Sequence, residues 1–271
     1  MTDTSEVMEL RGLKLRKDPA REACFKVVHR DVDMHEYGGM SETSRRERLH
    51  RHMNNEIGGL EIAAQMLVDF PDAPWELRMQ LARQSWDETR HIMLLYHRLR
   101  QLGGHKGEFP VSNFEWCVTN TFDTIAARLA VQNRTFEAGQ MDILGKITTS
   151  WRAVGDHETA DMLDGILADE IQHVRFANQW IRKLVEADRR LVLRIATAMM
   201  FLRHANDLLA PEEGEVNPVG TPVFNPNSKT FDVNVPDRRE AEFSADEIHE
   251  VLRQAGFRSI IPEHYAGEQG E

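Results

Sequence analysis

The sequence has few cysteines, no long hydrophobic run and a deficit of positive charge. Its two cysteines, Cys24 and Cys117, lie too far apart for a Cys-x-x-Cys metal or redox pair, and both are expected to be small buried side chains. The best apolar candidate, "LVLRIATAMMFL" at 191–202, is shorter than the roughly 18 residues of a membrane-spanning helix and contains Arg194. No membrane partner is therefore predicted.

The start of the chain and its charge exclude further classes of protein. "MTDTSEVMELRGLKLRKD" lacks the apolar segment of a secretory signal, so we expect a cytoplasmic protein. A formal net charge of −11 disfavours nucleic acid as a partner, because phosphate binding depends on clustered lysine and arginine. A hydrophobic content of 41% with 28% charged residues is ordinary for a globular chain.

Apolar residues in the middle of the chain recur at helical spacing. Five helices are predicted, the first capped by Ser44, at 44–70, 74–102, 114–151, 158–185 and 188–209. A short last helix follows Ser244, with Glu247 completing a capping box. The predicted fold is an all-α four-helix bundle with a fifth packed helix. It comprises an irregular N-terminal arm at 1–43, the helical bundle at 44–210, and a Pro- and Asn-rich C-terminal extension with one short helix at 211–271.

A short motif of acidic residues and histidine occurs twice. "WDETRH" at 86–91 and "ADEIQH" at 168–173 both place an aspartate before a glutamate and a histidine three residues after that glutamate. Residues three apart lie on the same face of a helix. Glu88 and His91 therefore share the apolar seam of one predicted helix, and Glu170 and His173 share that of another.

Each motif is preceded by one glutamate on the seam of the helix before it, Glu56 or Glu137. Glu56 and Glu88 are 32 residues apart, and Glu137 and Glu170 are 33 apart. Both midpoints fall in predicted turns, so the two members of each pair would face one another in an antiparallel hairpin. The whole unit repeats after 81 or 82 residues. This spacing predicts that all the repeated side chains meet inside the bundle.

Glutamates on interior seams require neutralisation, because a buried carboxylate is costly unless it is paired or bound to a cation. The seams lack the lysines and arginines that a network of buried salt bridges would need, which favours metal ions. One glutamate from each of two helices and a Glu-x-x-His from each of two others form a known two-metal ligand set. The predicted metal ligands, of which the four glutamates are also the predicted catalytic residues, are Glu56, Glu88, His91, Glu137, Glu170 and His173.

With these motifs the chain resembles the ferritin-like superfamily of carboxylate-bridged di-metal proteins. It is similar to the di-iron oxygenases, including the p-aminobenzoate-type N-oxygenases, and most similar to bacterial ferritin-like proteins with an N-terminal arm and a C-terminal extension. The resemblance covers roughly 44–210 and implies a ferritin-like bundle, the same six ligands, and two iron ions or iron with manganese. It also implies that Asp87 and Asp169 each orient an imidazole. Gln172 departs from the pattern, since the first motif has Arg90 there.

Other acidic and histidine residues are weaker candidates for the site. Glu61 is the rival of Glu56 but lies off the seam. Glu47 and His50 repeat the motif spacing about 13 Å along the helix from Glu56, so they cannot join the same site and are expected to be a chance match on the surface. His204 on the fifth helix stays open as a seventh ligand.

Small and aromatic residues also lie close to the motifs. Gly58, Gly59 and Gly139 are next to ligands inside helices, where they leave room for oxygen or substrate or else allow close helix packing; both interpretations stay open. Trp86 and Trp180 are expected to be core aromatics.

The ligand pattern and the resemblance favour a di-iron, or iron and manganese, oxidase or oxygenase. It would activate O2 to hydroxylate, desaturate or N-oxygenate a small organic substrate. An external electron donor is expected, because no Cys-x-x-Cys rubredoxin module is present. An iron-handling ferroxidase is the alternative, and a tRNA hydroxylase is disfavoured by the acidic charge. A homodimer is the expected assembly.

Overall fold

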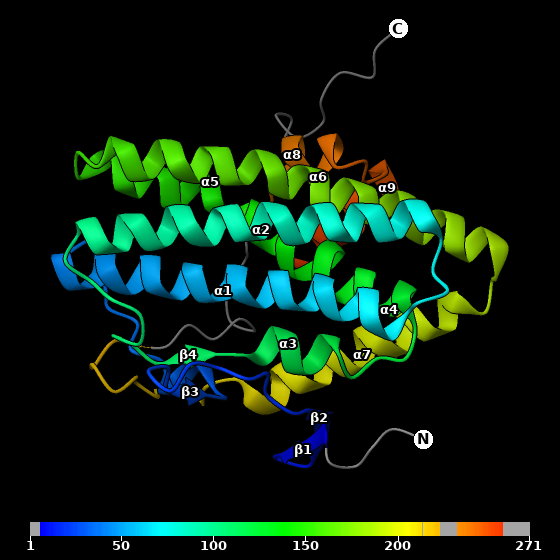
Figure 1. The fold of residues 1–271 in the computed structure, drawn as a ribbon, viewed down its shortest axis with the longest axis horizontal. Helices are drawn as coiled ribbons and strands as arrows, with labels where there is room; N and C mark the ends of the chain where they lie inside the picture. Colours follow the sequence, from blue (N-terminus) through cyan, green and yellow to red (C-terminus); the bar gives the residue numbers. More distant parts are fainter. Residues whose placement is uncertain (1–5, 213, 223–231, 257–271) are drawn as a thin grey trace, which may run out of the picture.

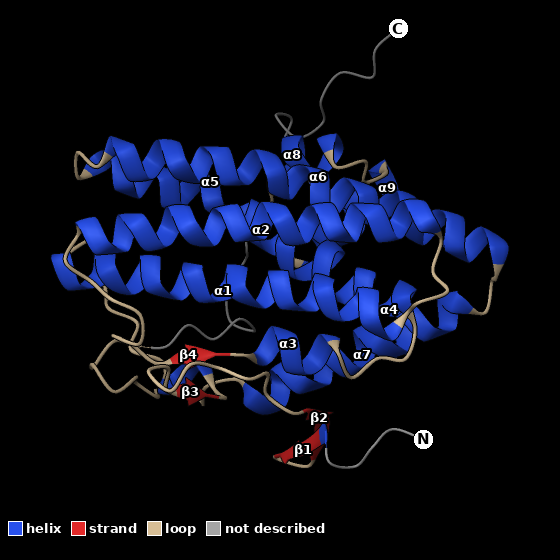
Figure 2. Cartoon of the chain, in the orientation of Figure 1, coloured by secondary structure: helices blue, strands red, loops and turns tan. Residues whose placement is uncertain are grey.

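Four long helices form the centre of the molecule. In the computed structural model α1 (Glu42–Asp69) lies antiparallel to α2 (Trp75–Gln101), and α5 (Ala138–Ala153) lies antiparallel to α6 (His157–Ala187) (Figure 1). Strands are confined to two small sheets (Figure 2). The predicted all-α helical bundle is confirmed. The structure describes residues 6–212, 214–222 and 232–256, and the rest of the predicted terminal extensions lies outside these ranges.

Two apolar layers lie along the bundle with a polar layer between them. One contains Leu49 and Met53 of α1, and the other contains Ile62 and Met66 of the same helix. Glu56 lies between the two layers along the helix. The buried seam passes through Gly59 and Met66 and leaves Leu60 and Leu67 half-buried, because the 3.6-residue period of the helix drifts from a strict seven-residue repeat such as Met53, Leu60 and Leu67.

The third predicted helix is not continuous, which corrects the prediction of one helix over 114–151. The chain forms α3 (Phe114–Thr119), breaks, and resumes as α4 (Ile125–Val131), whose N-cap Thr124 accepts a hydrogen bond from the Ala127 backbone N–H. A π-helical turn, Gln132–Glu137, then joins α4 to α5. Such wide turns occur mostly inside helices at functional sites, and this one ends at a predicted ligand.

Shorter elements cover two sides of the bundle (Figure 1). On one side, β1 (Val7–Leu10) pairs antiparallel with β2 (Leu13–Arg16) through a turn at Arg11 and Gly12, both with positive φ. A 3₁₀ turn follows at Asp31–Asp33. The remaining elements on that side are β3 (Val27–Val28), which pairs parallel with β4 (Val111–Ser112), and α7 (Leu191–Leu209), the predicted fifth helix.

The C-terminal helices lie on the opposite side, against α5 and α6 (Figure 1). α9 (Ala245–Gln254) has the predicted capping box of Ser244 and Glu247. α8 (Val235–Glu240) falls in a segment predicted to be loop. Its Arg238 pairs with Asp142 of α5 at 2.6 Å, a tertiary contact that local sequence does not encode.

Several local predictions were wrong. The N-cap of α1 is Ser41, whose hydroxyl accepts the Ser44 N–H, while the Ser44 hydroxyl donates to backbone carbonyls. Cys24 is exposed although Cys117 is buried. Trp86 is 65% exposed although Trp180 is buried, because Trp86 lies off the seam of α2. Across the described ranges, no helix combines the length and apolarity needed to cross a membrane.

Candidate metal centre

The six predicted ligands meet in the polar layer of the bundle, and all are buried. Their donor atoms form two overlapping groups, and within each group the atoms lie within 4.8 Å of one another. Glu88 and Glu170 belong to both groups. Glu56 and His91 complete the first group, and Glu137 and His173 complete the second, so each group has three carboxylates and one imidazole. Each can hold a metal ion.

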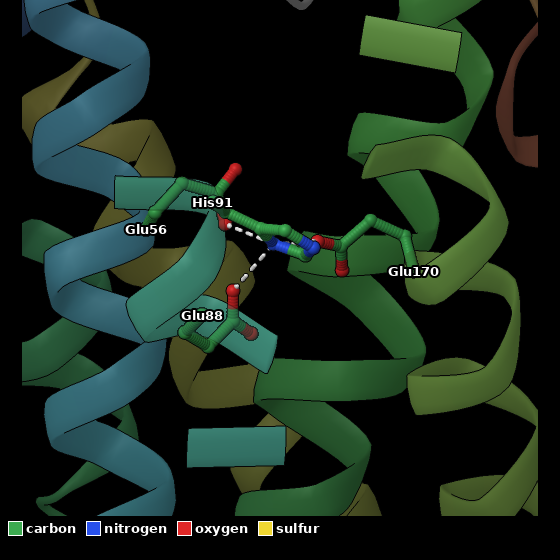
Figure 3. A group of neighbouring side chains, drawn as sticks. All are labelled: Glu56, Glu88, His91 and Glu170. Carbon is green, nitrogen blue, oxygen red and sulfur yellow. Dashed lines mark hydrogen bonds and ion pairs between the residues drawn. The ribbon is translucent and has the colours of Figure 1, made fainter. Parts of the chain in front are cut away.

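The first group surrounds the ring of His91 (Figure 3). Its Nδ1 lies 3.3 Å from Glu56 Oε2 and 3.1 Å from Glu88 Oε2, and Glu170 approaches from α6 with Oε1 at 3.4 Å. Glu170 Oε1 is buried and accepts no hydrogen bond from any described residue. A buried carboxylate oxygen without a donor is costly, and a metal ion would neutralise it.

The second group has the same arrangement on the other side of the shared carboxylates. His173 Nδ1 lies 3.3 Å from Glu170 Oε2 and 3.5 Å from Glu88 Oε1. Glu137 enters from the end of the π-helical turn. In both groups the Nδ1 atom faces the carboxylates, which leaves Nε2 for a partner outside the group.

Each motif aspartate contacts the histidine of the other motif. Asp169 Oδ2 lies 3.1 Å from His91 Nε2, and Asp87 Oδ2 lies 3.5 Å from His173 Nε2. A carboxylate at Nε2 keeps a proton there and directs Nδ1 toward a metal. Arg90 joins the two aspartates, with Nη2 2.9 Å from Asp87 and 2.8 Å from Asp169. The outer contacts are asymmetric, as the sequence predicted, because the matching position in the second motif is Gln172, which accepts from Arg175.

The crowding of carboxylates and imidazoles in the site shifts the pKa values of the predicted ligands. Burial and the charge of Glu170 raise the pKa of Glu137 to about 8 and that of Glu88 well above its ordinary value. Burial opposes charge on His91, but its contacts with Glu56 and Glu88 raise its pKa to about 11. Glu56 is the exception: burial raises its pKa, but hydrogen bonds from His52 and His91 hold it well below 4.5. The crowded carboxylates therefore depend on bound positive charge.

Amide side chains and a further histidine contact the outer glutamates, and sequence reasoning assigned them no role. Gln84 Nε2 donates to Glu137 Oε1 at 2.5 Å and Asn133 Nδ2 donates to Glu137 Oε2 at 2.8 Å. Gln84 lies four residues before Glu88 and Asn133 four residues before Glu137, so helical spacing puts each amide on the face of its neighbouring ligand, and this was the signal available. His52 and Gln140 contact Glu56 Oε1 at 2.8 and 2.9 Å, but neither lies on a predicted seam.

The remaining candidate residues lie elsewhere. Glu61 pairs with Arg21 of the N-terminal arm. Glu47 and His50 are outside both groups, but the prediction of a surface position was wrong, since both are buried. Glu47 pairs with Arg51, and His50 Nε2 accepts the Gly107 N–H. His204 is exposed on α7 and belongs to neither group.

A cavity of about 470 Å³ lies beside the first group. His52 and Gln140, which contact Glu56, form part of its lining. The cavity is therefore separated from the Glu56 carboxylate by one layer of side chains.

Replacing Gly59 by Ala is expected to lower metal affinity roughly tenfold. A Cβ at Gly59 would lie 3.1 Å from Glu88 Oε1, so the shared carboxylate would have to move by a few tenths of an ångström. Gly58→Ala is the matched control, since its Cβ meets nothing within 4 Å. Calorimetric titration with Mn²⁺ measures both variants, and equal affinities would show that Gly59 serves helix packing alone.

Replacing Asp169 by Asn is expected to weaken metal binding by roughly 10–100-fold, the usual effect of losing a carboxylate that orients a ligating histidine. The amide no longer fixes the proton on His91 Nε2, which lies 3.1 Å away. Asp72→Asn, in the exposed loop between α1 and α2, is the control. Unchanged affinity in Asp169→Asn would contradict an orienting role.

Comparisons with known proteins gave a match to a protein family and a partial match to one relative. An uncharacterized protein of Haemophilus influenzae Rd is 30% identical over 103 residues, which are 38% of this chain and 36% of that protein. The match thus spans about a third of the relative's length. No solved structure matches the chain. A family model described as "Protein of unknown function (DUF455)" matches residues 3–249. Because that match covers most of the sequence, the chain belongs to the DUF455 family.

Proposed function

We propose that this protein is a ferritin-like di-metal oxidase or oxygenase that acts on a small organic substrate. The observation that carries the proposal is the pair of overlapping groups that share Glu88 and Glu170, each with one outer glutamate and one imidazole. This is the donor set of a carboxylate-bridged two-metal site. Glu170 Oε1, which accepts no hydrogen bond from a described residue, fits a cation as well.

The residues have distinct roles in this proposal. Glu88 and Glu170 would bridge two metal positions, while Glu56 with His91 and Glu137 with His173 would each serve one. Asp169 and Asp87 would hold protons on the Nε2 atoms of the histidines. Two iron ions, or iron with manganese, would supply the redox chemistry that couples O2 reduction to substrate oxidation. Electrons would come from an external donor, since the sequence has no Cys-x-x-Cys rubredoxin module.

The cavity beside Glu56 favours an organic substrate over iron storage. It adjoins one half of the site through His52 and Gln140 and has the volume of a small-molecule pocket. A ferroxidase needs a path for iron and no organic pocket. Iron handling by a ferroxidase is therefore the second candidate function.

Metal content and oxygen uptake test the proposal together. Protein purified without oxygen and loaded with Fe²⁺ should hold about two metal ions per chain, measured by elemental analysis. With a chemical reductant present, it should consume O2 repeatedly without accumulating ferric iron. Oxidation of many Fe²⁺ per chain with growth of a ferric core would favour the ferroxidase. Absence of stoichiometric metal after loading would contradict both.

A further inference from the structure

The cavity beside Glu56 is lined by both apolar and charged side chains. It lies among α1, α5 and α6, and Glu36 and Glu115 also contribute to its lining. Apolar side chains dominate on the α5 and α6 sides, with Phe136, Leu144, Ile147, Trp151 and Leu163 among them. Charged residues of α1, together with Lys146 of α5, lie on the lining as well. This combination suits a ligand with an apolar body and one charged group.

Among the described residues, the ion pairs of the lining side chains leave Arg48 as the lining Lys or Arg residue without a carboxylate partner. Arg51 pairs with Glu36 and Glu47, and Lys146 pairs with Asp232. Within the described part of the chain, Arg48 has no carboxylate at ion-pair distance. Its Nε donates to Ser44 Oγ and its Nη2 to the Gly39 carbonyl, both at a long 3.3 Å.

The two acids on the lining do not cancel that cation. Glu36 is paired with Arg51. Glu115 is half-buried, and burial raises its pKa to about 7, so much of it is neutral at neutral pH. The available charge in the cavity is therefore the guanidinium of Arg48, whose planar donors suit a carboxylate.

We infer that this cavity binds an organic acid, with its carboxylate at Arg48 and its apolar chain or ring against Ile147, Trp151 and Leu163. The ligand would lie one layer of side chains, His52 and Gln140, from Glu56. Only the claim that this acid is the substrate rests on the proposed function. Binding itself requires no metal.

Gly139 offers a way to fill the cavity without disturbing the helix. It lies on the lining, and a Cβ there meets nothing within 4 Å. Gly139→Leu therefore projects a side chain into open space, and leucine favours a helix more than glycine does. Gly145→Leu is the matched control, because it lies on the same helix, is exposed, and also has open space around its Cβ.

The test is calorimetric titration of the full-length, metal-free protein with decanoate, decanol and decylamine. Decanoate should bind more tightly than either neutral or cationic analogue. Gly139→Leu should weaken decanoate binding at least about tenfold, while Gly145→Leu matches the wild type within about twofold. Arg48→Met should weaken decanoate by about tenfold and leave decanol unchanged, because it removes the charge and keeps an apolar stem.

Three results would overturn the inference. The first is the absence of decanoate binding, and the second is wild-type binding by Gly139→Leu. Tighter binding of decylamine would reverse the assigned charge and also overturn it. Iron content of separate samples loaded with Fe²⁺ distinguishes a failure of this inference from a failure of the proposed function. Decanoate binding by a protein that takes up no stoichiometric iron would remove the oxygenase and keep the acid site. Stoichiometric iron uptake without decanoate binding would remove the acid site and leave the proposed function standing.

Discussion

Glu170→Gln is expected to abolish stoichiometric metal binding, with a loss of affinity of roughly 100-fold or more, beyond the effect of losing an outer contact. Glu170 supplies an oxygen to both donor groups, so one substitution damages both positions. An amide of the same shape cannot supply the negative charge that bridges two cations. Elemental analysis after loading with Fe²⁺ measures the effect.

The thermal stability of the metal-free protein serves as a control that this variant still folds. Glu170 raises the pKa of both Glu88 and Glu137, but it also lies 3.3 Å from His173 Nδ1, so its removal relieves repulsion and loses an ion pair in the metal-free protein. Because these two effects oppose each other, the metal-free variant should melt close to the metal-free wild type. Metal at about 100 times its Kd should stabilise the wild type by roughly 2.7 kcal/mol and leave the variant unchanged. Glu186→Gln, exposed on the same helix, should behave as wild type. Full metal loading of Glu170→Gln would contradict the role of Glu170 as a ligand in both donor groups.

Metal affinity should rise steeply with pH between pH 6 and 8. The pKa of His91 is raised to about 11, so His91 carries its proton throughout this range, and the pKa of Glu137 is raised to about 8, so Glu137 is mostly protonated at pH 6 and 7. A metal ion must displace these protons. Raising the pH lowers the proton concentration, and apparent affinity should increase by about tenfold per pH unit for each proton released.

Proton release can be counted directly with Mn²⁺ as the probe. Titrations in two buffers of different ionisation enthalpy give the number of protons released at pH 7. Glu137→Gln should bind Mn²⁺ more weakly and release fewer protons, since its amide holds no exchangeable acid proton. Affinity that does not change with pH would show that the ligands are already deprotonated and would refute the protonated state inferred from their crowding.

The site was more predictable than its surroundings for a physical reason. Glu56 and Glu88 are fixed relative to one another by a hairpin with a short turn, so sequence distance from that turn predicts which residues face each other. Helical spacing then places His91 beside Glu88. The repeat alone predicts that the two hairpins meet, because each hairpin places the same kind of polar residues on the side that faces the shared interior.

Features that depend on contacts between distant segments could not be predicted. His52 and Gln140 approach Glu56 from outside the seams, and their role depends on how α5 packs against α1. The burial of Glu47 depends in the same way on the N-terminal arm, whose Glu36 pairs with Arg51, the partner of Glu47. The π-helical turn that ends at Glu137 has no simple sequence signal. The spacing of hydrophobic residues alone predicts a continuous helix there.

That π-helical turn has a consequence for how the two halves of the site differ. It lengthens one hairpin only, and it brings Asn133 beside Glu137, where Asn133 and Gln84 donate to both carboxylate oxygens. Glu56 has instead a histidine and an amide that adjoin a cavity. In the proposed di-metal site, the position served by Glu56 would therefore be the more accessible one, and the position served by Glu137 the more firmly held one. We expect such a site to fill and empty in two steps.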